Sequence, residues 1–276
     1  MIAPAYSLSD GNSIPAIGLG TYGLNEQVGI EAIVSGIADG YRLIDTAYNY
    51  GNEDVVGEAV RRTDVDRSDL IITTKLPGRH HGFEETIASL EESRKRLDLD
   101  WIDLYLIHWP LPRIDKFVDS WRAMIRLREK GLVRSIGVSN FTADMLARLQ
   151  RETGVMPVVN QVELHPYFPQ EELRAYHDEH GIRTESWSPL GKRSALLDEP
   201  VIGEIATEHE VSPAQVVLRW HIELEAVPIP KSADAARRRQ NIDVFSFSLS
   251  ADEVEAITAL QRGRLWDGDP ETNEEF

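Results

Sequence analysis

Short, mostly apolar runs alternate with amphipathic stretches along most of this chain. The runs 70–74 and 102–107 are typical of strands that are buried in a parallel sheet. Between such runs, apolar residues recur three or four positions apart, as on one face of a helix, and the segment Ile30–Ile37 is an example. About eight strands alternate with helices in this way, which favours a (β/α)8 barrel over a doubly wound sheet. We therefore predict an α/β fold with one barrel domain over residues 1–276.

The same pattern gives approximate positions for the individual elements. Glycine after a helical pattern indicates the end of a helix, and a Ser-Pro pair indicates its first turn. The predicted strands are 17–20, 42–45, 70–74, 102–107, 133–138, 158–160, 182–187 and 226–229. The predicted helices are 30–40, 83–97, 117–131, 145–149, one that ends at Gly181, 201–206, and one that starts at Ser212.

Segments at both ends of the chain lie outside this repeat. Residues 6–15 contain Asp-Gly-Asn between two short alternating runs, which predicts an N-terminal hairpin that covers one end of the barrel. Residues 250–260 begin with the Ser-x-x-Glu spacing of a capping box, which predicts an additional C-terminal helix. The acidic tail 261–276 has one apolar pair, Leu265 and Trp266, and would be either a mobile loop over the site or a frayed end.

The composition narrows the possible functions. The 276 residues include 46 acidic and 29 basic side chains, which give a formal net charge of -17. This balance disfavours nucleic acid and anionic membranes as partners, because phosphate recognition requires basic side chains. The chain has no cysteine, which excludes disulfides and zinc-thiolate sites. It shows neither a secretory signal nor an apolar run long enough to cross a membrane, so we expect a cytoplasmic protein.

Side chains suited to proton transfer follow three successive predicted strands. Asp45, Lys75 and His108 each stand where an apolar run stops, and Tyr50 follows five residues after the first of them. In a fold of alternating strands and helices, the carboxyl ends of the strands converge at one end, where active sites are built. The sequence therefore predicts one site that contains a carboxylate, a phenol, an amine and an imidazole.

These four residue types suggest one kind of chemistry. A tyrosine needs a nearby cation to act as an acid, because its ordinary pKa is about 10. Lys75 could provide that cation, Asp45 could keep the buried lysine charged, and His108 could align the oxygen of a substrate. Such a set protonates an oxygen on which negative charge develops, as when a carbonyl receives hydride. Each residue alone could be a rim residue, and Asp45 could cap a turn, but the combination favours a catalytic site.

Longer motifs around these residues strengthen the interpretation. They resemble the signature segments of the aldo-keto reductases, in particular a bacterial branch that includes 2,5-diketo-gluconate reductases and methylglyoxal reductases. The resemblance covers about residues 5–260. The matching segments are Asp45–Glu53, Ile72–Lys75, Leu106–Pro110, Ile136–Phe141, Val159–Pro166 and Ile229–Ser232, followed by Arg237 and Asn241.

The resemblance implies NADPH-dependent reduction of an aldehyde or ketone, such as a 2-dicarbonyl or a keto-sugar acid. It gives Tyr50 the role of general acid, in agreement with the chemistry of the strand ends. It also implies a substrate pocket lined by Tyr22, Asn49 and Trp109, although the tryptophan could equally belong to the core.

The same resemblance implies a binding site for NADPH (NADP+) along the ends of the later strands. Ser139, Asn140 and Gln161 should hold the nicotinamide carboxamide, and Trp187 should stack on the nicotinamide ring. No Gly-x-Gly-x-x-Gly motif follows the first strand, so a Rossmann-type site is not expected. The implied cofactor residues are Gly20, Thr21, Ser139, Asn140, Gln161, Trp187, Ser188, Leu190, Gly191, Lys231, Ser232, Ala233, Arg237, Gln240 and Asn241.

Basic residues after the last strand predict where the cofactor phosphate binds. Lys231 and Arg237 should face the 2′-phosphate, because barrels commonly bind phosphate after the last strands. Asp234 lies between them and would either weaken the preference for NADPH or point away. Arg238 and Arg239 are better explained as a solvated helix face.

Two other functions remain open at this point. A metal-dependent barrel hydrolase or isomerase would use Asp45, His108, Glu163 and His165 as ligands, but Pro166 argues against a strand that carries the last two on one face. A regulatory protein of the same fold would bind nucleotide with weak catalysis. We expect no metal and a small carbonyl compound as the binding partner. Because the helix faces show no additional apolar stripe, we also expect a monomer.

Overall fold

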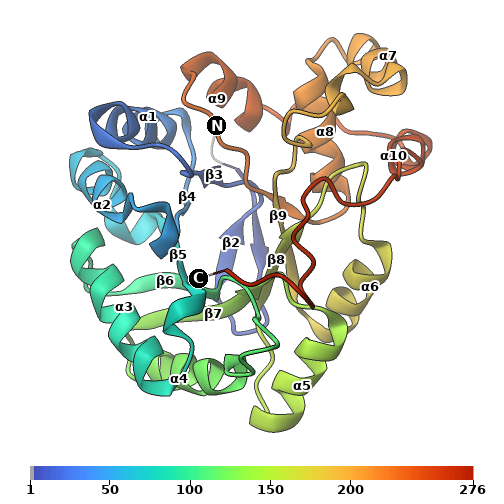
Figure 1. The fold of residues 1–276 in the computed structure, drawn as a ribbon. Helices are drawn as coiled ribbons and strands as arrows, with labels where there is room; N and C mark the ends of the chain where they lie inside the picture. The colour runs from blue at the N-terminus through green and yellow to red at the C-terminus, as the bar shows by residue number, and fades with distance from the viewer. Residues whose placement is uncertain (1–2, 276) are drawn as a thin grey trace.

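The computed structural model describes residues 3–275 and confirms the predicted barrel (Figure 1). Eight parallel strands in this range form one curled sheet in chain order. Backbone N–H groups of Gly18 and Gly20 donate to the carbonyl oxygens of Pro228 and Pro230, at 3.0 and 3.1 Å, and so join the first strand to the last. The strands are β3 (Leu19–Gly20), β4 (Leu43–Asp45), β5 (Ile71–Leu76), β6 (Ile102–Ile107), β7 (Val133–Ser139), β8 (Val159–Glu163), β9 (Arg183–Trp187) and β10 (Val227–Pro228).

Ten α-helices in the described residues surround the sheet. Gly40 and Gly181 cap two of them with φ values of 119° and 66°, Ser212 is an N-cap, and Ser250 forms a capping box, as the sequence predicted. Ser212 forms a capping box as well, with Gln215. None of these helices is both long and apolar enough to cross a lipid bilayer. The helices are α1 (Glu26–Asp39), α2 (Glu53–Arg62), α3 (Phe83–Leu97), α4 (Phe117–Glu129), α5 (Ala143–Thr153), α6 (Glu171–His180), α7 (Pro200–Glu208), α8 (Pro213–Glu223), α9 (Ala235–Ile242) and α10 (Ala251–Thr258).

Two short helices were not placed by the hydrophobic pattern. The helix α2 begins directly after the strand-end motif of Asp45 and buries a narrow face that includes Val56 and Ala59. The helix α9 is strongly basic, yet Arg238 on it is buried and donates to the carbonyl oxygens of Ser232 and Ala233. The prediction of a solvated helix face was therefore wrong for Arg238, which holds the loop after β10 in place.

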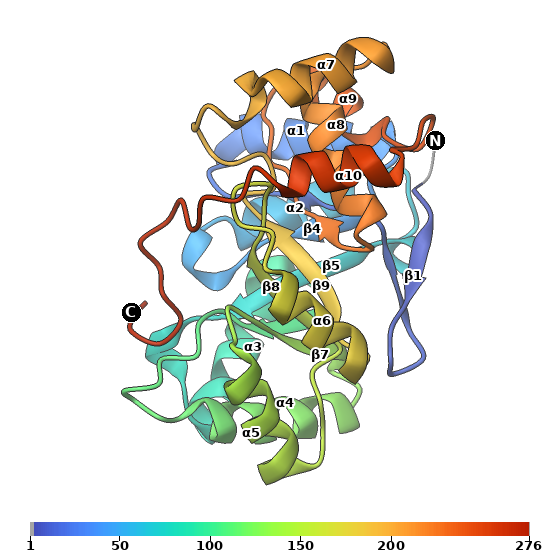
Figure 2. The same ribbon diagram turned by 90° about the vertical axis from the view of Figure 1, so that its right-hand side faces the viewer.

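An apolar plug closes the end of the barrel that lies away from the strand carboxyl ends. Strands β1 (Ala5–Ser7) and β2 (Ser13–Pro15) form the predicted hairpin, and Figure 2 shows it on the opposite side of the barrel from the C-terminal tail. Leu8 and Ile14 of the hairpin belong to the same buried cluster as apolar residues of the strands; these include Leu43, Leu104, Leu106, Val159, Val227 and Ile229. These apolar side chains thus keep water out of the end of the barrel that carries the hairpin.

Polar side chains form the next layer of the barrel interior. Side chains two residues apart on a strand point the same way, so Asp45 follows Leu43 and Gln161 follows Val159 into the interior. Gln161 pairs in register with Glu185 on the neighbouring strand. A layer of ionisable and amide groups therefore lies directly above the apolar plug, at the base of the mouth.

Candidate active site

Lys75 and Asp45 form a buried ion pair at the ends of neighbouring strands. The Nζ atom of Lys75 donates to both carboxylate oxygens of Asp45, at 2.6 and 2.8 Å, and to the carbonyl oxygen of Thr46, at 3.0 Å. Lys75 is fully buried and Asp45 is 4% exposed. An ammonium group has three N–H donors, so its hydrogen-bonding capacity is filled and its charge is balanced.

The ion pair affects both titrating groups of the site. Burial by itself would lower the pKa of Lys75, but the Asp45 carboxylate reverses this and leaves the pKa above its usual value. Burial raises the pKa of Tyr50, and the positive charge of Lys75 opposes that rise. Lys75 thus acts on Tyr50 in the direction that the sequence predicted, although the net pKa of the phenol lies above its ordinary value.

Tyr50 lies between two other aromatic rings at the mouth of the barrel. It ends the short 3-10 helix η1 (Tyr48–Tyr50), which follows β4. The Nζ atom of Lys75 is 5.1 Å from the centroid of the Tyr50 ring. The ring of His108 meets it edge-on at a centroid distance of 5.9 Å, and that of Tyr22 does so at 5.2 Å. The structure therefore brings together all four residues that the strand ends predicted.

Polar groups at the ends of β7, β8 and β9 are tied together by hydrogen bonds. The Ser139 hydroxyl donates to the backbone oxygen of Gln161 at 2.7 Å. The side-chain nitrogen of Asn140 donates to the backbone oxygen of His108 at 3.0 Å, and its oxygen accepts from the indole N–H of Trp187 at 2.8 Å. Asn140 has a φ of 64°, a conformation that asparagine adopts more readily than most residues. The indole of Trp187 is thereby fixed beside the amide groups.

Basic side chains lie at the other end of the same edge. Lys231 and Arg237 are exposed after β10 and in the first turn of α9. Asp234 caps α9, and its carboxylate accepts from the backbone N–H of Arg237 at 2.9 Å. The carboxylate of Asp234 is thus used as the N-cap of α9.

Other predicted cofactor residues lie at the end of β3, after β9 and on α9. Thr21 donates to the backbone oxygen of Asp45 at 2.9 Å, and a Cβ on Gly20 would lie 3.2 Å from the backbone oxygen of Ile229. Gly191 has a φ of 68° and closes a turn onto Ser188. Gln240 is exposed and Asn241 is buried on α9.

This set of groups fits a dinucleotide phosphate. Amide and hydroxyl groups at one end suit a carboxamide, which has both donors and an acceptor, and the flat indole beside them suits a ring. Exposed basic residues at a helix N-terminus suit a phosphate. The hydride of NADPH would be the chemistry that the cofactor supplies between these ends.

The C-terminal tail crosses the mouth of the barrel, as Figure 1 shows. Glu163 is buried, and one of its carboxylate oxygens accepts from the backbone N–H groups of Leu265 and Trp266, at 2.7 and 3.2 Å. The ring of Trp266 packs edge-on against Trp187 at 5.7 Å. At the end of the tail, a carboxylate oxygen of Glu275 lies 3.0 Å from Nδ1 of His108. The structure thus favours a loop over the site rather than a frayed end.

We predict that Glu163→Ala frees the tail while the barrel stays folded. Each hydrogen bond to a charged acceptor stabilises by about 1.5–3 kcal/mol, so hydrogen exchange of the Leu265 and Trp266 amides should accelerate by at least about tenfold. Residue-resolved hydrogen exchange measures this directly. Glu172→Ala, an exposed change on α6 near the same segment, is the control and should leave both rates unaltered. Unchanged exchange in Glu163→Ala would show that other contacts hold the tail.

The predicted substrate residues also surround the mouth. Tyr22 is 67% exposed, next to Tyr50. The side-chain oxygen of Asn49 accepts from Arg79 at 2.6 Å. Trp109 is partly exposed, and a Cβ added to Gly268 of the tail would lie 2.7 Å from its ring, so this tryptophan lies under the tail and not in the core.

The alternative metal site does not form. Within residues 3–275, no group of three or more histidine, aspartate or glutamate side chains could hold a metal ion. The strand β8 ends at Glu163, as Pro166 indicated, and Nε2 of His165 lies 3.1 Å from the carboxylate of Glu163. Of the four proposed ligands, Asp45 is bound in the lysine ion pair, Glu163 and His165 lie together at the anchor of the tail, and His108 lies beside the Tyr50 ring.

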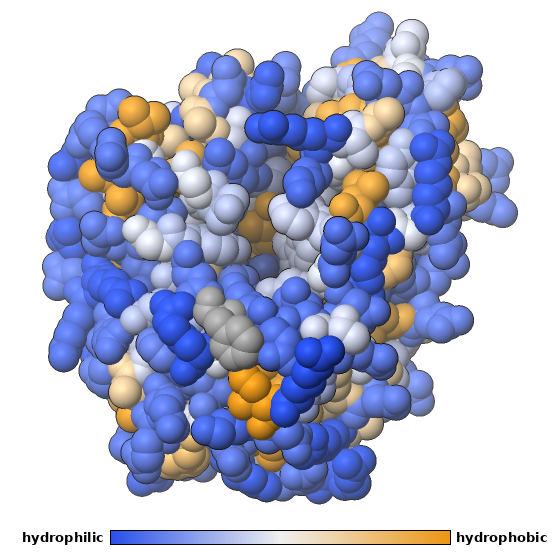
Figure 3. All heavy atoms as spheres, viewed as in Figure 1, coloured by the Kyte–Doolittle hydropathy of each residue, from blue (hydrophilic) through white to orange (hydrophobic). Residues whose placement is uncertain are grey.

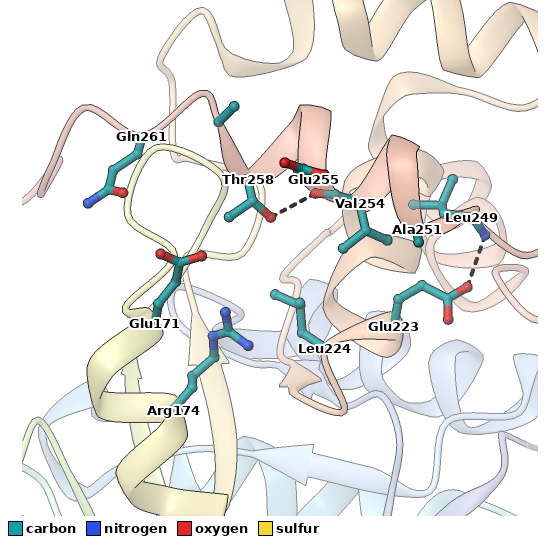
Figure 4. Close-up of a pocket in the computed structure, with 11 residues that line it drawn as sticks. Glu171, Arg174, Glu223, Leu224, Leu249, Ala251, Val254, Glu255, Thr258 and Gln261 are labelled. Atoms are coloured by element: carbon teal, nitrogen blue, oxygen red, sulfur yellow. Dashed lines mark hydrogen bonds between the residues drawn. The ribbon is translucent and has the colours of Figure 1, made fainter.

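Two cavities lie outside the tetrad, one under the tail and one between helices. Figure 3 shows a hollow near the centre of the face that carries the tail. A cavity of about 320 Å³ under the tail borders Asn140 and Glu163. A larger groove of about 660 Å³ lies between α6, α8 and α10, and Figure 4 shows Arg174 and Glu171 on one wall and Leu249 on the other. No residue that lines this groove belongs to the predicted site.

Sequence reasoning missed the roles of three acidic residues at the site, although it had named Glu163 as a ligand of the alternative metal site. Glu185 is buried and linked to Asp45 through Gln161, Glu163 anchors the tail, and Glu275 reaches His108. Glu185 lies two residues before Trp187 on the same strand, so both side chains point to the same face. This alternation could have placed Glu185 inside the barrel from the sequence. The position of Glu275 had no such signal, because it depends on where the whole tail folds.

Comparison with known proteins agrees with this site. The family model "Aldo/keto reductase family" matches residues 16–262. The chain is 60% identical over 273 residues to 2,5-diketo-D-gluconic acid reductase B of Corynebacterium sp., with 99% of each chain covered. It is 45% identical over 265 residues to a methylglyoxal reductase of Escherichia coli, with 96% of each covered. A structure of a Gox0644 variant in complex with NADPH has a TM-score of 0.94 at 42% identity and covers 99% of this chain and 100% of that chain.

The barrel, the buried Lys-Asp pair and the adjacent tyrosine and histidine define an oxidoreductase that acts on carbonyl groups. The chain belongs to the aldo/keto reductase family. As a member of this family, it is an NADPH-dependent reductase of aldehydes or ketones.

Proposed function

We propose that this protein reduces a small aldehyde or ketone with Tyr50 as the proton donor. The observation that carries the proposal is the buried contact of Lys75 with Asp45 directly beside the Tyr50 ring. The cation stabilises negative charge that develops when the phenol gives up its proton. The ring of His108 meets the same ring edge-on, and His108 would orient the carbonyl oxygen.

The proposed substrates are 2-dicarbonyls and keto-sugar acids. Two relatives are named for reduction of such compounds, a diketogluconic acid and methylglyoxal. Tyr22, Asn49 and Trp109 would line the pocket, and the tail would form its outer wall. The test is the oxidation of NADPH, followed by absorbance, with a panel of small aldehydes, 2-dicarbonyls and keto-sugar acids. Absence of turnover with every member of the panel, despite NADPH binding, would instead support the regulatory alternative.

The proposed contact between Arg237 and the 2′-phosphate gives a quantitative expectation. Arg237→Ala should weaken NADPH binding by about tenfold or more, since a hydrogen bond to a charged group contributes about 1.5–3 kcal/mol. Binding of NADH, which lacks this phosphate, should change little. Fluorescence titration with both nucleotides measures the two dissociation constants. Arg239→Ala removes an exposed arginine from the same helix and should leave both unchanged. If Arg237→Ala weakened the binding of NADPH and NADH equally, Arg237 would not contact the 2′-phosphate.

We also propose that the protein acts as a monomer with a single domain. Among residues 3–275, the exposed large apolar side chains are Tyr22, Val28, Phe83 and Trp266; they are spread over different elements, and two of them lie at the mouth. A subunit interface would gather such residues in one patch. The cytoplasmic location stays a prediction from the sequence.

A further inference from the structure

A second carboxyl group lies in the same layer as the catalytic ion pair, and the reaction as described does not use it. Glu185 projects into the barrel from β9 and is fully buried. One of its oxygens accepts from the side-chain nitrogen of Gln161 at 2.9 Å, and the other has no partner among the described residues. Buried polar groups are rarely left in this state without a reason.

Gln161 links this carboxyl to the catalytic pair. Its side-chain nitrogen donates both to Asp45 and to Glu185, each at 2.9 Å. Both amide hydrogens of Gln161 are therefore used. The side-chain atom that faces the two carboxyl oxygens must be the amide nitrogen, because an oxygen there could not donate to them. The amide plane is fixed by these two bonds, and its oxygen is left free to accept a hydrogen bond.

We propose that Glu185 is a positioning residue for hydride transfer, which acts through Gln161 by holding its amide between the Asp45–Lys75 pair and the nicotinamide. This proposal rests on the proposed function, because it assigns the free oxygen of Gln161 to the carboxamide. With Glu185 in place, the amide cannot rotate without losing a bond at a buried site. Without it, Asp45 alone would hold the amide, through a single bond that permits rotation.

The charge state of Glu185 follows from its surroundings. The titratable and charged groups that act on it are Asp45 on β4 and Lys75 on β5, and both carboxylate oxygens of Asp45 already bind that lysine. Burial, and then the charge of Asp45, raise the pKa of Glu185 to about 8. The neutral carboxyl still accepts from Gln161, so the positioning role holds at neutral pH.

Ionisation of Glu185 would change the electrostatics of the site. Above a pH of about 8, a second negative charge would lie beside Lys75. It would counteract the lysine charge that Tyr50 uses when negative charge develops. The value of kcat/KM of the native protein should therefore fall as the pH rises through this range.

Glu185→Gln and Glu185→Leu separate these effects. Glutamine reproduces the neutral carboxyl, so Glu185→Gln should keep kcat and the KM for NADPH at neutral pH and lose the decline of kcat/KM near pH 8. Leucine removes the acceptor, so Glu185→Leu should raise the KM for NADPH and lower kcat by about tenfold. Asp103→Asn is the control, because Asp103 is also a buried carboxylate but lies near the start of β6. It should lose stability and keep both the KM and the pH profile.

Stability provides a readout that does not depend on turnover. Between the ordinary pKa of a glutamate and about 8, folding must add a proton to Glu185, so the stability of the native protein falls with rising pH in this window. The Tm of Glu185→Gln should therefore exceed that of the native protein by a margin that widens up to that pH. This margin remains measurable even if Glu185→Leu does not fold.

Two results would overturn the proposal. One is a folded Glu185→Leu variant that keeps the native kcat and the native KM for NADPH, and the other is a Glu185→Gln variant with the same kinetic loss at neutral pH as Glu185→Leu. An active Glu185→Gln that keeps the alkaline decline would overturn the assignment of that decline to Glu185. Native protein that binds NADPH but reduces no member of the carbonyl panel would instead contradict the proposed function. The nucleotide affinity of Glu185→Leu, measured by fluorescence, would still report on Gln161 in that case.

Discussion

Tyr50→Phe is expected to lower kcat by about a thousandfold, within the range that a single general acid contributes. Phenylalanine keeps the ring between Tyr22 and His108 but has no proton to give. Burial raises the pKa of Tyr50, so the phenol carries its proton at neutral pH and is ready to donate it. Stopped-flow or steady-state oxidation of NADPH with the best carbonyl substrate measures the loss.

A neighbouring tyrosine supplies a matched control for this change. Tyr48 belongs to the same short helix, but its hydroxyl donates to Glu92 at 2.5 Å and accepts from Arg96 at 2.8 Å, among the outer helices. Tyr48→Phe should leave kcat close to that of the native protein. NADPH affinity, measured by fluorescence quenching, should be the same in both variants. A Tyr50→Phe variant with native turnover would show that another group donates the proton.

The tetrad could be predicted because each member lies at the end of a strand, or shortly after it, and the hydrophobic pattern makes these strands easy to find. Lys75 and His108 directly follow apolar runs, and parallel strands bring their ends together irrespective of the details of the helices. The barrel followed from the same alternation. The alternation of strand and helix patterns therefore predicts the barrel topology, and that topology brings the reacting groups together.

Other features depend on contacts between distant segments. The helix α2 buries a narrow apolar face between charged ends, so its pattern is weak without the barrel beneath it. Arg238 looks like one member of a basic run, and only the fold of the loop after β10 gives it buried carbonyl acceptors. Glu163 binds backbone groups about a hundred residues later, a contact that no local spacing indicates.

The second large effect is expected from removal of the charge of Lys75. Lys75→Met should lower kcat by about a hundredfold or more, because the cation that favours loss of the Tyr50 proton is gone. It should also cost about 3–5 kcal/mol in the free energy of unfolding, since Asp45 would remain buried without its counter-ion. Urea unfolding and NADPH oxidation measure the two losses separately.

The double variant Asp45→Asn/Lys75→Met separates catalysis from stability. Replacing both charges leaves no unpaired ion, so most of the lost stability should return while kcat stays as low as in Lys75→Met. Recovery of turnover together with stability would mean that the cation is not needed and that the single variant was inactive through misfolding.

The pH dependence of the unfolding free energy adds a further test of the ion pair. The pKa of folded Lys75 is raised above that of the unfolded chain, so its stabilising contribution is complete below the unfolded value and is lost as the pH rises through the folded one. Above a pH of about 10, the free energy of unfolding of the native protein should therefore fall relative to that of the double variant.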